Sequence, residues 1–415
     1  MTLFQLKDFK MTKLAEVDVR FVLLAALLVF LPGIEALKNI FALLFVLSWI
    51  ILAKKNNDWG GKWQVIDTIF LLWILVNIFV SINAVIVHEL SGRNFRDVLR
   101  FVLIAWVLSR IYFPKEKLIE LALISVTATI ITLVYSYYST GGILKELHSV
   151  GHINHTAIFL VIAYSISLSL LLFDFHSLKN YQKISLLIST IVLFSATIDT
   201  DSRAAFGLII IITLVDFIYL LIKYRKLSTF LLLFGLVSCV GVFFINNPPK
   251  ALDRLLAKDH ILHDVTRDRM RNFSYYAFKT NPLLGIGFGN YSLIKIDDIK
   301  AEIIEDKGVF NASEYLPSSH AHNVYYTYLV SGGLLIFSIF LWFWFYIVWI
   351  IFKLRSSKEN KWIILSSISI LLINLGIGWV NTTLHHEHAI LSMFVLGMLI
   401  SEYRRAKHER SLHAP

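Results

Sequence analysis

The sequence predicts an all-α, polytopic membrane protein with about twelve transmembrane helices and one large loop on the outer face. Of its 415 residues, 57% are hydrophobic and only 16% are charged, and the mean hydropathy is +0.67. A soluble domain of this length does not need so much apolar material to fill its core. The apolar residues also recur in runs of about 20, the length that a helix needs to cross a hydrocarbon layer about 30 Å thick.

Charged segments and Gly or Pro residues separate the expected spans. The first apolar run follows a charged start and has no small-residue cleavage site, so we expect it to remain as a span. Pro32 and Gly33 separate two short runs, for which a re-entrant pair is the alternative. We place the spans near 18–33, 37–53, 65–87, 97–113, 117–138, 156–173, 182–198, 204–222, 229–245, 324–352, 362–381 and 387–402.

Basic residues in the short loops predict the orientation. Lysine and arginine, Arg110 and Arg404 among them, concentrate in alternate loops and in both terminal segments, which the positive-inside rule assigns to the cytoplasmic face. Membrane orientation therefore explains the net charge of +10, and no nucleic-acid partner is expected. The opposite face carries the short loops 88–96, 139–155, 199–203 and 382–386.

One long segment on that outer face divides the chain into three regions. Residues 1–245 hold nine expected spans, residues 246–323 form a loop domain with candidate site residues, and residues 324–415 hold three spans and a cytoplasmic tail. Helices are expected in the loop domain at Asp264–Thr280 and Asp297–Lys307. A loop of this size between two spans is commonly functional.

Two features exclude other kinds of site. The Gly-Ile-Gly-Phe-Gly stretch at 285–289 lacks the spacing and the strand–helix frame of a dinucleotide site, so we expect a tight turn after Asn281-Pro282 that returns the chain toward the membrane. Cys239 is the single cysteine, so the chain has no internal disulfide and no cysteine-based metal site.

Arg203 is the first candidate for binding a phosphate group. It lies where the seventh span reaches the outer face and the eighth begins, with Asp201 and Ser202 as candidate helix caps. Its guanidinium is suited to a phosphate ligand. The alternative is an interfacial arginine whose side chain extends to lipid headgroups.

Three further arginines begin the first expected loop helix. Arg267 and Arg271 share a helical face, and Arg269 points away, toward a pairing with Asp264 or Asp268. Two guanidinium groups on one face match a pyrophosphate through bidentate hydrogen bonds. A solvated basic helix is the alternative.

His320 and His322 end the loop domain directly before the tenth span. Asn323 follows them and is placed either to bond an imidazole or to cap the helix. A histidine at a helix N-terminus tends to be neutral, as a general base must be. Metal binding by the two rings is the competing reading, but no third ligand has an obvious spacing, and no metal site is expected.

Two other histidine groups face the same side. His385, His386, Glu387 and His388 lie in the last outer loop, where adjacent side chains point in different directions on a helix or a strand, so we expect an interfacial polar tip. The remaining candidates for lining a shared cavity precede the sixth span, and they are His152, Asn154 and His155.

Several of these motifs together resemble the O-antigen ligase/polymerase superfamily. They are Asp-Ser-Arg-Ala around Arg203, the Arg267–Arg271 helix leading into Asn-Pro-Leu-Leu-Gly-Ile-Gly-Phe-Gly-Asn-Tyr, and Ser-His-Ala-His-Asn-Val-Tyr followed by Ser-Gly-Gly-Leu. The resemblance concentrates in residues 195–335. Elsewhere the agreement is in the number and orientation of the spans.

The resemblance implies a membrane-embedded, GT-C-like inverting glycosyltransferase of the bacterial inner membrane, independent of metals and of cofactors. Its active site would be periplasmic, its donor an undecaprenyl-pyrophosphate-linked glycan, and its acceptor a lipid A–core sugar. Arg203 and Arg267 would bind the pyrophosphate, and His322 would be the essential histidine. Arg271 stands where the family often has an aromatic residue, which leaves the choice between the two loop arginines open, and His320 is a second candidate base.

Three other functions are the alternatives. A polysaccharide polymerase or a protein O-oligosaccharyltransferase of the same superfamily would use the same donor, although the latter usually has a longer soluble C-terminal part. A transporter for a lipid-linked glycan would also have many spans. Such proteins usually place ionisable residues at mid-membrane or show repeated halves, and neither is apparent in the sequence.

Overall fold

The computed structural model describes residues 18–88, 90, 95–142, 144, 146–224, 265–357 and 359–412. These residues form helices joined by short connections, and none of them belongs to a β-strand. The span expected near 229–245, with Cys239, and the first part of the loop domain lie outside the described residues. The long helices are α2 (Val19–Phe30), α3 (Glu35–Asn56), α4 (Val65–His88), α5 (Phe95–Ser109), α6 (Lys115–Ser139), α7 (Ile153–Phe173), α8 (Asn180–Asp199), α9 (Arg203–Tyr224), α12 (Val265–Thr280), α13 (Ile296–Lys307), α14 (Val324–Leu354), α15 (Lys361–Gly376) and α16 (His386–Leu412).

Eight of the described helices are long and apolar enough to cross a membrane: α3, α4, α6, α7, α8, α9, α14 and α15. The chain is therefore a polytopic membrane protein. Three other expected spans form helices that do not reach that length or apolarity. The helix α2 has 12 residues and α5 has 15, whereas α16 is long but ends in a charged segment.

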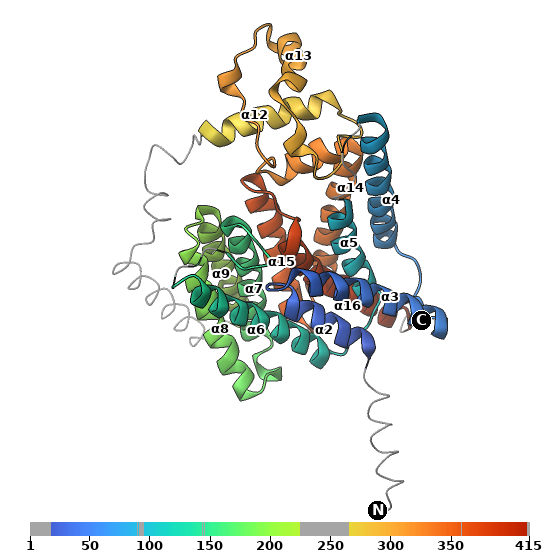
Figure 1. Cartoon of the computed structure of the whole chain (residues 1–415). Helices are drawn as coiled ribbons and strands as arrows, with labels where there is room; N and C mark the ends of the chain where they lie inside the picture. Colours follow the sequence, from blue (N-terminus) through green and yellow to red (C-terminus); the bar gives the residue numbers. More distant parts are fainter. Residues whose placement is uncertain are drawn as a thin grey trace, which may run out of the picture.

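The helix α7 lies at the centre of the membrane bundle. In its most apolar stretch 83% of the residues are buried, more than in any other of the eight helices, and it packs against α6, α8, α9, α15 and α16 (Figure 1). The outer helices instead expose large apolar side chains, such as Ile51, Ile86, Ile131 and Ile188. Apolar surface of this extent fits contact with lipid.

A buried carboxylate ties together two arginines that the sequence assigned to one face. Asp67, at the start of α4, is fully buried. Its Oδ1 accepts hydrogen bonds from Arg110 Nε at 2.8 Å, just after α5, and from an Arg404 guanidinium nitrogen at 2.6 Å, in α16. Trp106 Nε1 donates to the same oxygen at 2.8 Å. This end of the bundle is thus held by charge as well as by packing.

The helices α12 and α13 form a small domain beyond the opposite end of the bundle (Figure 1). Both helices were expected, and each begins within one residue of the predicted start. The domain has its own apolar core, which is separate from that of the bundle and includes Phe273, Tyr276, Ile299, Ile303 and Tyr315. This core also includes Val330 of α14, so the domain packs directly onto the bundle.

The helix α14 is interrupted one third of the way along, at Gly333. This residue has φ 61° and ψ −166°, a conformation that is essentially restricted to glycine. The segment from Pro282 to Gly287 runs beside the interruption and satisfies the backbone groups that the helix leaves unpaired. Ile286 N and Gly287 N donate to the carbonyls of Val330 and Ser331 at 3.0 and 2.8 Å.

The pairing continues on the far side of the break. Leu334 N donates to Pro282 O at 2.8 Å, and Leu335 N donates to Leu283 O at 3.3 Å. The two backbones approach so closely that a Cβ at Gly333 would lie 2.3 Å from the Leu283 carbonyl, and one at Gly285 would lie 2.5 Å from Val330 O. The glycine-rich stretch is thus a turn, as expected, and it docks the outer domain onto α14.

We expect Gly333→Ala to destabilise the protein by about 2–4 kcal/mol, because it adds both backbone strain and a steric clash. Thermal unfolding in detergent measures this loss. Gly207→Ala in α9 is the matched control, since no atom lies within 4 Å of the added Cβ, and its stability should be unchanged or slightly higher. Equal stabilities of the two variants would contradict the role given to the break.

Candidate active site

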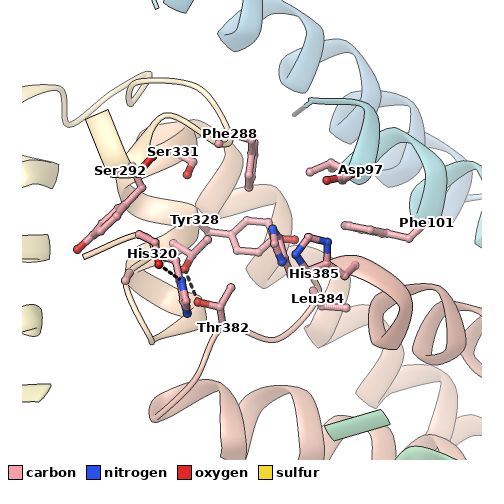
Figure 2. Close-up of a pocket in the computed structure, with 17 residues that line it drawn as sticks. Asp97, Phe101, Phe288, Ser292, His320, Tyr328, Ser331, Thr382, Leu384 and His385 are labelled. Atoms are coloured by element: carbon pink, nitrogen blue, oxygen red, sulfur yellow. Dashed lines mark hydrogen bonds between the residues drawn. The ribbon is translucent and has the colours of Figure 1, made fainter. Parts of the chain in front are cut away.

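A cavity of about 370 Å³ lies where the outer domain meets the bundle (Figure 2). Its apolar walls are Phe101 from α5, Phe288 from the glycine-rich turn and Tyr328 from α14. Polar groups also face it, among them Asp97 and His320. Aromatic faces beside a few polar groups are typical of small-molecule sites.

The three histidine groups of the sequence form one cluster beside this cavity. His155, near the start of α7, is its centre, and its ring centroid lies 5.2–6.4 Å from those of five others. These five are His152, His320, His385, His386 and His388. His322 joins through His320, with the two rings 3.9 Å apart. Separate sequence segments therefore share one polar site at the same end of the bundle.

Asn323 fixes the backbone that carries His322. Its side-chain oxygen accepts from Tyr326 N at 3.0 Å, so it caps α14, and its side-chain nitrogen donates to Trp379 O at 2.9 Å. Of the two roles considered for Asn323, the structure has the helix cap. His322 itself has a left-handed φ of 48°, which turns the chain sharply before the helix begins.

The surroundings of His322 keep its ring neutral. Burial lowers the pKa of His322 to about 4, helped by the charge of Arg267 and by the charge that His320 and His152 carry when they are protonated. Burial and His152 also lower the pKa of His320, whose Nδ1 lies 2.8 Å from Ser319 Oγ. Both rings are therefore able to accept a proton at neutral pH.

The loop arginines occupy different surroundings on α12. Arg267 lies close enough to His322 to affect the titration of its ring. Arg271 is exposed and pairs with Asp268, which the sequence had offered as a partner of Arg269. Arg269 is partly buried, and its Nε has no hydrogen-bond partner among the described residues. Of the three, Arg267 has the described link to the histidine cluster.

Arg203 is the first residue of α9 and does not line the cavity. Ser202 Oγ accepts from Ala205 N at 3.5 Å, a long cap hydrogen bond, and Asp201 has a left-handed φ of 54°. The helix α9 packs against the short η5 helix, Ile377–Trp379, whose last carbonyl accepts from Asn323. The helix that carries Arg203 is thus connected through η5 to Asn323, the residue next to His322.

A buried ion pair that the sequence reading missed holds the last histidine group in place. Lys38 of α3 pairs with Glu387 of α16, and the two side chains are 2% and 4% exposed. Lys38 Nζ also donates to Ser149 Oγ at 2.8 Å. The sequence signal for this ion pair was a single lysine near the start of an otherwise apolar span. A lysine buried at such a position requires a partner of opposite charge.

One comparison with known proteins gives a match that covers part of this site. A family model described as O-antigen ligase matches residues 188–341, which run from α8 through the outer domain into α14. No curated protein gives a significant sequence match. The matched region includes Arg203, Arg267 and His322, whereas the cavity also takes Asp97 and the 382–386 turn from outside it.

We expect Lys38→Met or Glu387→Gln alone to cost about 3–5 kcal/mol, because each leaves an uncompensated buried charge. The double variant should lose much less than the sum. A double-mutant cycle from thermal unfolding in detergent measures the coupling. Lys117→Met is the control, since its pair with Glu120 is exposed and should contribute about 1 kcal/mol or less. Additive losses would show that the two charges do not act as a pair.

Proposed function

We propose that this chain, a member of the O-antigen ligase/polymerase superfamily, is an inverting O-antigen ligase. It transfers glycan from undecaprenyl pyrophosphate to a sugar hydroxyl of lipid A–core, at the periplasmic face of the inner membrane. The observation that carries this proposal is the neutral, half-buried His322 beside Arg267, at the base of the outer domain. A proton acceptor and a fixed positive charge are the two groups that the reaction requires.

The reaction is a single displacement. His322 takes the proton of the acceptor hydroxyl while the oxygen of that hydroxyl attacks the anomeric carbon of the donor sugar. The bond from that carbon to the pyrophosphate oxygen breaks on the opposite side, so the configuration inverts. The leaving group keeps the bonding electrons as undecaprenyl pyrophosphate, and the proton on His322 then passes to solvent.

Arginines stabilise the charge that develops on the leaving oxygen. Arg267 and Arg203 are assigned to the pyrophosphate, with Arg271 and Arg269 as further candidates on α12. Guanidinium groups bind phosphate oxygens through paired hydrogen bonds and remain charged throughout. With this stabilisation the pyrophosphate is a good leaving group, and the proposed reaction uses no nucleotide and no cofactor.

His320 is the alternative base, and the cavity favours a role for it near the acceptor. Of the His320 and His322 rings, that of His320 lines the cavity, together with Phe288 and Tyr328. Aromatic faces of this kind stack against the apolar faces of sugar rings, so the cavity is the proposed acceptor pocket. His322, whose ring lies 3.9 Å from that of His320, is then placed between this acceptor pocket and Arg267, where the acceptor hydroxyl would meet the donor.

We expect His322→Ala to lower transfer by about 10²–10⁴-fold and Arg267→Ala by about 10²–10³-fold. The assay uses purified protein in liposomes with an undecaprenyl-pyrophosphate-linked glycan and a lipid A–core acceptor. His148→Ala and Lys300→Ala are controls, because both residues are exposed and lie outside the site, and they should retain full activity.

Unchanged transfer by both His322→Ala and His320→Ala would overturn the assignment of the base. Cells carrying the His322→Ala variant separate the ligase from the polymerase. Loss of capped lipid A–core while long undecaprenyl-linked glycan persists supports the ligase, whereas loss of the long glycan itself supports the polymerase.

We also expect an unusual pH dependence. Because a base must be unprotonated, the acidic limb of kcat/KM should lie near pH 4, the pKa of His322, and not near the 6.5 of an ordinary histidine. The bound pyrophosphate offsets the charge of Arg267, so the limb of kcat should lie at higher pH. Replacing His320 by Gln should raise the kcat/KM limb, since that ring lowers the His322 pKa. A limb at 6.5 in the wild type would contradict a base with the lowered pKa of His322.

A further inference from the structure

A carboxylate and two histidines converge on one wall of the cavity. Asp97 lies in the first turn of α5, and His385 and His386 lie where α16 begins. One ligand atom from each of the three lies within 4.8 Å of the other two. Figure 2 shows Asp97 and His385 facing the same space from two separate elements.

The local backbone explains why two adjacent histidines meet at all. Side chains at neighbouring positions diverge on a helix or a strand, which was the argument against a metal site in this loop. Here Leu384 and His386 both adopt left-handed conformations, with φ 53° and 51°. The resulting sharp turn brings the rings of His385 and His386 to 3.6 Å between centroids.

The missing third ligand comes from a distant part of the sequence. Packing of α5 along α16 places Asp97 opposite the two rings. Arg100 contacts Oδ1 of Asp97 and also the side chain of Asn39, and a carboxylate has a second oxygen with which to bind a cation. His385 Nδ1 has no hydrogen-bond partner among the described residues.

We propose that Asp97, His385 and His386 form a binding site for a transition-metal ion of the Zn²⁺ class. Two imidazole nitrogens and a carboxylate oxygen suit Zn²⁺ far better than Mg²⁺ or Ca²⁺, which prefer oxygen ligands. Three protein ligands leave a fourth position, and it opens into the cavity. His386 is exposed, so the ion has access without unfolding of the site.

Charge around the site favours reversible rather than permanent binding. Arg100 offsets the charge of Asp97, and Lys38 and Glu387 offset each other next to the two histidines. A divalent cation therefore enters surroundings that have little net negative charge to attract it. The ion is thus a reversibly bound regulator and not a structural ion that the fold requires.

The consequence of binding rests on the proposed function. An ion held at this wall, with its own water, occupies part of the cavity that would receive the acceptor sugar. Zn²⁺ therefore inhibits transfer, and the inhibition depends on its three ligands and not on the base.

The decisive experiment measures Zn²⁺ binding directly, which requires no enzymatic activity. Isothermal titration of the full-length protein in detergent, purified without a polyhistidine tag, should show one Zn²⁺ per chain, bound reversibly, and no binding of Mg²⁺. His386→Gln and Asp97→Asn should each weaken binding at least about tenfold. His148→Gln, on the same face but outside the cluster, should bind as the wild type does.

Absence of stoichiometric Zn²⁺ binding, or binding that survives both substitutions, overturns the site whether or not the protein is a ligase. The transfer assay then tests the consequence. Zn²⁺ should inhibit the wild type and the His148→Gln variant but not His386→Gln. If Zn²⁺ binds at the site and wild-type transfer continues unchanged, the inhibitory role is wrong.

Discussion

The interruption of α14 at Gly333 is the constraint on which the arrangement of the site depends. An interruption within a helix leaves backbone amide and carbonyl groups without hydrogen-bond partners, and the apolar interior cannot supply these partners. Here the Pro282–Gly287 segment satisfies them from both sides of the break. One backbone pairing thereby fixes the outer domain, and with it Arg267, relative to the first turns of α14, where His322 is placed.

Desolvation gives this site its electrostatic character. Seven imidazoles gather in a small volume, and two of them, His320 and His322, have lowered pKa values because they are largely removed from water. Neutral rings do not compete with a cationic side chain for an anionic ligand. In the proposed reaction Arg267 is therefore the fixed charge that a phosphate group would meet on approaching His322, and the same neutrality leaves nitrogen lone pairs available for protons or metal ions.

Sequence reasoning succeeded where local pattern determines structure. The two helices of the outer domain, the turn at 285–289 and the cap at Asn323 all follow from propensity and turn chemistry within a few residues. The family resemblance over 195–335 agrees with the family match at 188–341. The positive-inside argument also grouped Arg110 with Arg404, and these two meet on Asp67.

Sequence reasoning failed where residues that are far apart in the sequence come into contact. Lys38 has its partner at the start of the last helix, and Asp97 approaches His385 only through the packing of α5 on α16. The divergence expected of His385 and His386 was wrong because two left-handed residues lie in the turn. The left-handed conformation of Leu384 could not be predicted from the sequence pattern, because most residues avoid this conformation for steric reasons.

The Lys38–Glu387 pair also has a consequence for biosynthesis. A chain that is made and inserted from its N-terminus places the lysine of α3 in the membrane first, while the glutamate of α16 emerges from the ribosome only after the intervening helices. Until then the ammonium group has no counter-charge and draws water or lipid headgroups into the nascent bundle. Docking of α16 removes that defect, so this face of the bundle closes only after α16 has been made and inserted.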